Sequence, residues 1–157
     1  MKSHHFLLIG LTGLLFACGE MSQDEPSTIL AQTSEKLVKR DFDPEQIKRG
    51  EAVYLANCTA CHGKKGEAGP DWRKPGADGR YPPPPLNGTA HTWHHSTAVL
   101  KKTILEGGPS GLNGLPSMMP AWQGKLSEQQ VDDVLVWIKS LWPDEIYDAW
   151  YRRIEKR

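Results

Sequence analysis

The feature that most constrains the fold of this chain is the pentapeptide Cys58-Thr59-Ala60-Cys61-His62. Cysteines three positions apart lie on one side of a helical turn, so both sulfur atoms face the same surface. The imidazole of His62 follows directly and lies beside that surface. A fold that contains this segment must therefore accommodate a group that two thiols and an imidazole can hold together.

Three chemistries use paired cysteines at this spacing. A redox dithiol is expected between the strand and helix of a βαβ unit, whereas this pair ends a helical segment. A structural zinc site needs further Cys or His ligands; the third cysteine, Cys18, lies near the N-terminus, and the histidines of residues 91–95 are the other candidates. Covalent attachment of haem c uses thioethers from Cys58 and Cys61, with His62 as the proximal iron ligand. We therefore predict one covalently bound haem c.

The composition fits a small domain built around such a cofactor. The chain has 157 residues and six tryptophans, which need more apolar surface than a small protein core supplies by itself. Its net charge of 0 argues against a nucleic-acid partner. We find no constellation of nucleophile and general base in the sequence, so we predict no catalytic residue and no enzyme activity.

The N-terminus has the pattern of an export signal. Lys2 precedes the apolar run of residues 6–16, which is too short to span a bilayer, so residues 1–17 are predicted to be a signal peptide. The residues before Cys18 also resemble the lipobox of bacterial lipoproteins, which implies that Cys18 carries the lipid. The alternative is an ordinary signal peptide with a coincidental cysteine. The polar segment 18–42 then becomes a flexible tether between the lipid and the domain. By the same resemblance, Gly19 directly after the cysteine slightly favours the outer membrane as the site of anchoring.

Capping signals predict three helices, and the sequence therefore favours an all-α fold. The first begins at Asp43, an N-cap residue followed by proline at the first helical position. The second spans residues 96–106 and ends at a pair of glycines. The third begins with a capping box at Ser127, carries apolar residues at helical spacing, and ends before Pro143.

These residues resemble the class I cytochrome c family over residues 43–142. The resemblance implies helices packed around one covalently bound haem, with long Pro/Gly-rich loops between them. It also implies that the N-terminal and C-terminal helices cross where a glycine meets an aromatic ring. Gly50 and Tyr54 match the first helix, and Trp137 matches the second.

The same resemblance implies a residue that orients the proximal histidine and a distal iron ligand. Pro70 corresponds to a family proline whose carbonyl orients the proximal histidine. Met119 directly precedes Pro120 and corresponds to the distal iron ligand, with Met118 as the second choice. A thioether ligand stabilises ferrous iron and raises the reduction potential.

The segment 91–95 contains three histidines around Trp93, and it allows more than one interpretation. His91, His94 and His95 are imidazole ligands suited to copper or zinc, and one of them is an alternative iron ligand. We favour a simpler hypothesis, in which Trp93 packs on the haem edge and the histidines lie in a polar loop or bond the haem propionates.

The resemblance implies a monohaem electron carrier whose iron cycles between ferrous and ferric states. We expect a monomer that exchanges electrons with redox proteins on the periplasmic side of a bacterial membrane. The basic residues of the loops near the haem either steer an acidic partner or keep the surface soluble. Residues 143–157 are predicted to form an amphipathic helical extension. The alternatives are a dedicated haem subunit of a respiratory oxidase or dehydrogenase, and a haem-based ligand sensor.

Overall fold

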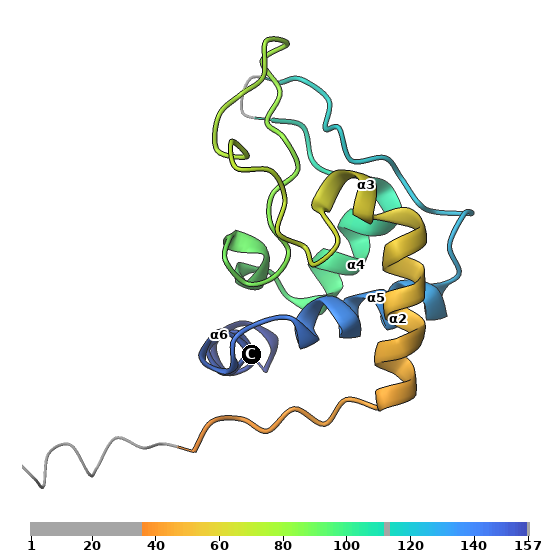
Figure 1. The fold of residues 1–157 in the computed structure, drawn as a ribbon, viewed down its shortest axis with the longest axis vertical. Coiled ribbons are helices and arrows are strands. Elements are labelled where there is room, and N and C mark those ends of the chain that lie inside the picture. The colour runs from red at the N-terminus through yellow and green to blue at the C-terminus, as the bar shows by residue number, and fades with distance from the viewer. Residues whose placement is uncertain (1–35, 112–113, 157) are drawn as a thin grey trace, which may run out of the picture. The chain divides into compact units, whose positions relative to one another are not determined.

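The computed structural model describes residues 36–111 and 114–156, so the predicted signal peptide, Cys18 and the tether up to residue 35 lie outside the described residues. The described part is helical and contains no strand, which confirms the all-α prediction. No helix in these two ranges is long and apolar enough to cross a bilayer. The elements are α2 (Pro44–Asn57), α3 (Thr59–His62), the 3₁₀ turn η1 (His91–His94), α4 (Thr97–Glu106), α5 (Glu128–Ser140), α6 (Asp144–Trp150) and the π-helical turn η2 (Tyr151–Glu155) (Figure 1).

Helices α2 and α5 form the centre of the fold. The Asp43 side chain accepts a hydrogen bond from the first turn of α2, and Ser127 forms the predicted capping box at the start of α5. The two helices cross at Gly50, where a Cβ atom would lie 2.0 Å from the carbonyl oxygen of Asp133. One turn further along, the rings of Tyr54 and Trp137 pack with centroids 4.1 Å apart. Only a glycine lets the two backbones approach this closely.

A buried carboxylate lies beside this crossing. The side chain of Asp133 is only 3% exposed, and it accepts hydrogen bonds from Arg49 Nε at 3.0 Å and from Gln129 Nε2 at 2.8 Å. Burial acts to raise the pKa of Asp133, but the bonds from Arg49 and Gln129 outweigh burial and leave the pKa below its ordinary value. The carboxylate is therefore charged at neutral pH, with its oxygens paired across the helix contact.

The C-terminal extension packs onto the residues that precede α2. Trp142, Tyr147 and Trp150 are buried in the core. Arg40 donates to the backbone carbonyls of Lys139, Ser140 and Trp142 at the end of α5, and it pairs with Asp144 at 2.7 Å. The backbone N–H of Val38 donates to Asp148 at 2.8 Å.

These contacts move the predicted domain boundary. The described residues from Lys36 onward form one compact unit, so residues 36–42 belong to the folded domain and not to the tether predicted for 18–42. The reason is the guanidinium of Arg40, because it supplies the donors that the last carbonyls of α5 lack within the helix. The described part of the extension, residues 143–156, likewise belongs to this unit.

Candidate haem-binding site

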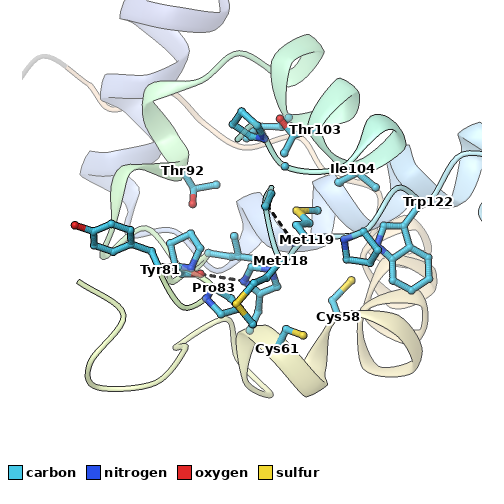
Figure 2. Close-up of a pocket in the computed structure, with 18 of the residues that line it drawn as sticks. Cys58, Cys61, Tyr81, Pro83, Thr92, Thr103, Ile104, Met118, Met119 and Trp122 are labelled. Atoms are coloured by element: carbon cyan, nitrogen blue, oxygen red, sulfur yellow. Dashed lines mark hydrogen bonds between the residues drawn. The ribbon is translucent and has the colours of Figure 1, made fainter. Parts of the chain in front are cut away.

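A largely apolar cavity of about 470 Å³ lies between α3, α4, α5 and the two loops that follow α3 and α4. Its size falls within the range of small-molecule and cofactor sites. Figure 2 shows Met118 and Met119 around the same cavity as Cys58 and Cys61. The apolar wall is contributed by Leu100, Ile104, Leu126, Leu135 and Ile138.

Helix α3 places the thiols of Cys58 and Cys61 at the cavity. It continues directly from α2, because the N–H of Cys58 bonds the carbonyl of Tyr54 at 2.8 Å and the N–H of His62 bonds the carbonyl of Cys58 at 3.0 Å. The Tyr54 hydroxyl donates to the carbonyl of Gly63 at 2.8 Å and holds the chain where it leaves α3. The two cysteines are not joined by a disulfide; Cys58 is half-buried and Cys61 exposed.

The ring of His62 is buried, lines the cavity and is oriented by a backbone carbonyl. Its Nδ1–H donates to the carbonyl of Pro84 at 2.9 Å, since a carbonyl can only accept. Burial lowers the pKa of His62, although the bond to Pro84 acts in the opposite direction. The imidazole is therefore neutral at neutral pH, with its free lone pair on Nε2. A metal-ligating histidine is usually arranged this way.

The orienting carbonyl belongs to Pro84, which corrects the prediction of Pro70. Pro70 is exposed in the loop after α3. The chain around Pro84 is fixed by three hydrogen bonds: the N–H of Leu86 donates to Gly66 at 2.7 Å, Trp142 Nε1 donates to Leu86 at 2.8 Å, and the Thr92 hydroxyl donates to Pro85 at 3.0 Å. In the sequence, the run of four prolines is the feature that could have pointed to this segment, because it predicts a stiff, extended backbone.

Both candidate distal methionines line the cavity, and the backbone of Met119 is held on two sides. Its N–H donates to Ser117 Oγ at 3.1 Å, and its carbonyl accepts from the N–H of Gly108 at 3.2 Å. Met118 is 52% exposed, whereas Met119 is partly buried. The backbone of Met119 lies close to the C-terminal end of α4, since a Cβ atom on Gly107 would lie 3.0 Å from the Met119 carbonyl oxygen.

The segment 91–95 is arranged differently from the prediction. His91, Thr92 and His95 line the cavity, but Trp93 is not among the lining residues. The Thr92 hydroxyl donates to the carbonyl of Pro85 at 3.0 Å, whereas Trp93 packs against His94 and the hydrophobic core. Burial and the neighbouring histidines lower the pKa of His95.

The site does not match the two other chemistries of paired cysteines. A redox dithiol needs a thiol with a depressed pKa, whereas burial, aided by Cys61, raises the pKa of Cys58 to about 11. Among residues 36–111 and 114–156, no three His, Cys, Asp or Glu side chains are grouped to hold a metal ion. An apolar cavity lined by two thiols, a neutral imidazole with a free Nε2 and two methionine thioethers instead fits a covalently attached haem.

The fold and the site define a c-type cytochrome domain. The family model described as "Cytochrome C oxidase, cbb3-type, subunit III" matches residues 45–138, which is more than half of the chain. The chain belongs to this family of class I cytochrome c domains.

Curated relatives carry similar cytochrome segments. The chain is 28% identical over 99 residues to the cbb3-type cytochrome c oxidase subunit CcoP of Azospirillum sp. (strain B510), covering 63% of this chain and 30% of the relative. It is 26% identical over 129 residues to the gluconate 2-dehydrogenase cytochrome c subunit of Pantoea cypripedii, covering 77% and 26%. The chain thus spans less than a third of the length of these relatives. Cytochrome CL of Methylophaga aminisulfidivorans is 19% identical with a TM-score of 0.49, covering 82% of this chain and 77% of that one.

Proposed function

We propose that this chain is a monohaem c-type cytochrome that carries single electrons between redox proteins. The observation that carries the proposal is the cavity that Cys58, Cys61 and His62 line together with Met119, which comes from the loop between α4 and α5. Cys58 and Cys61 form the thioethers, His62 is the proximal iron ligand and Met119 is the distal ligand. The haem supplies a one-electron couple when bound, and the protein supplies ligation, burial and orientation.

The residues around the ligands orient His62 and give the site an apolar wall. The carbonyl of Pro84 holds the His62 ring in the tautomer that leaves Nε2 for iron. The apolar side chains of α4 and α5 form one wall of the cavity. With His62 and Met119 both as iron ligands, a bound haem would have no open position for a substrate or gas, which favours electron transfer over ligand sensing.

Replacing Cys58 and Cys61 together by alanine is the direct test of covalent attachment. We expect the wild-type protein to keep its haem through denaturing electrophoresis, and the double variant to lose it completely. The single variants Cys58→Ala and Cys61→Ala should each retain haem through one thioether. Haem that still migrates with the denatured double variant would refute the assignment.

We further propose that the domain is anchored by lipid on Cys18 and faces the periplasm. The support is the lipobox resemblance and the absence of any other sequence role for Cys18. Because several acyl chains hold a protein far more firmly than one, we expect the wild-type protein in the membrane fraction with incorporated labelled fatty acid, and Cys18→Ser with none. Fatty-acid incorporation that survives Cys18→Ser would contradict the anchor.

A second candidate function is that of a haem subunit dedicated to one oxidoreductase. The observation that favours it is the match to a family described by an oxidase subunit, together with relatives that are named as oxidase and dehydrogenase subunits. Gel filtration of the gently solubilised protein separates the two functions. A carrier that exchanges freely elutes alone, whereas a dedicated subunit elutes with its enzyme at constant stoichiometry.

A further inference from the structure

Helix α4 connects the C-terminal extension to the loop that carries Met119. None of its residues is fully buried, and a helix of ten residues is only marginally stable in water by itself. Its apolar residues Leu100 and Ile104 line the haem cavity. In the middle of the helix Lys101 pairs with Asp132 of α5 at 2.9 Å, and further contacts hold its two ends.

The C-terminal extension holds the N-terminal end of α4. The carboxylate of Glu155 accepts from the backbone N–H of Thr97 at 2.8 Å, and Trp150 Nε1 donates to the carbonyl of His95 at 2.9 Å. Lys139 of α5 donates to the Thr97 hydroxyl at 2.9 Å, and its ammonium lies 4.8 Å from the Trp150 ring centre. A carboxylate at this end of a helix is also favoured by the helix dipole.

The other end of α4 holds the Met119 loop. The carbonyl of Ile104 accepts from the N–H of Trp122 at 3.1 Å, and that of Leu105 accepts from the N–H of Gln123 at 2.9 Å. Just beyond the helix, the N–H of Gly108 donates to Met119 at 3.2 Å. One continuous series of hydrogen bonds thus runs from the extension, through α4, to the segment that contains Met119.

We propose that Glu155 and Trp150 are positioning residues for the distal methionine. By fixing the start of α4, they keep its end in register with the Met119 loop and lower the rate at which the Met119 thioether leaves the iron. This inference rests on the proposed ligation by Met119. It gives Trp150 and Glu155 a role in the iron site, although neither of them lines the cavity.

The test uses carbon monoxide, which binds ferrous haem only after Met119 has left, so its binding rate reports ligand release. In Glu155→Ala we expect this rate to rise about two- to tenfold, and in Trp150→Phe to rise in the same direction. Glu155→Gln keeps an acceptor and should recover part of the wild-type behaviour. Glu145→Ala, at an exposed position of the same extension, is the matched control and should bind at the wild-type rate.

A double-mutant cycle with Met119→Ala separates positioning from other effects. Once Met119 is absent, Glu155→Ala should change the carbon monoxide rate no further; a residual increase would mean that the cavity itself had opened and would overturn the inference. An unchanged rate in both folded Glu155→Ala and folded Trp150→Phe would also overturn it. If Glu155→Ala fails to fold, Trp150→Phe decides alone. If instead Met119→Ala binds carbon monoxide as slowly as wild type, the proposed distal ligand is wrong, and the cycle shows this separately.

Discussion

Replacing Met119 by alanine is expected to lower the reduction potential by about 0.1 V or more, within the roughly 0.8 V that axial ligands span. The thioether stabilises ferrous iron, so its loss favours the ferric state. The same change opens the sixth coordination position, and carbon monoxide should then bind the ferrous form rapidly. The measurements are a potentiometric titration and the loss of the methionine–iron charge-transfer absorption.

Met118→Ala is the matched control for this variant. Met118 lines the same cavity but is half exposed, whereas the backbone of Met119 is fixed by Ser117 and Gly108. We therefore expect Met118→Ala to keep the charge-transfer absorption and to shift the potential much less. The reverse pattern would assign the ligand to Met118. Retention of the absorption in each single variant would contradict Met119 ligation.

Replacing Gly50 by alanine is expected to destabilise the haem-loaded protein by about 1–2 kcal/mol net. Alanine in place of glycine within a helix gains about 1 kcal/mol in intrinsic propensity. Here the new Cβ atom would lie 2.0 Å from the carbonyl oxygen of Asp133 and 2.9 Å from Trp137 Cβ. A backbone oxygen cannot move without its helix, so α2 and α5 must separate and the overpacking cost exceeds the propensity gain.

Chemical denaturation followed by circular dichroism measures this loss. Gly69→Ala adds the same methyl group where nothing lies within 4 Å, and it should change the free energy of unfolding by less than about 0.5 kcal/mol. Equal stability of Gly50→Ala and wild type would show that the two helices do not need their close approach.

The helices and their ends were predictable because the signals that set them are local. Asp43 and Ser127 cap helices through bonds to residues two or three positions away, and such bonds are visible as sequence spacing. The crossing of Gly50 with the helix that carries Trp137 was also predicted, but only through the family resemblance.

The loops were less predictable because their partners are distant in sequence. The carbonyl that orients His62 lies 22 residues away at Pro84. The entropic cost of closing a loop changes slowly with its length, so spacing gave no reason to prefer Pro84 over Pro70. Trp93 was misplaced for a related reason, because its contacts with the hydrophobic core are made by tertiary packing.

The sequence by itself determined how a haem would be attached, because a spacing of three residues places Cys58 and Cys61 on one helical face and His62 directly after them. Only the tertiary structure decided what surrounds that attachment. Three sets of hydrogen bonds join segments far apart in the chain. They are the bond from His62 to Pro84, the bonds by which Arg40 includes residues 36–42 in the domain, and the series from Glu155 through α4 to Met119. Such contacts form only when the packed core brings their donors and acceptors together, and no local pattern records them.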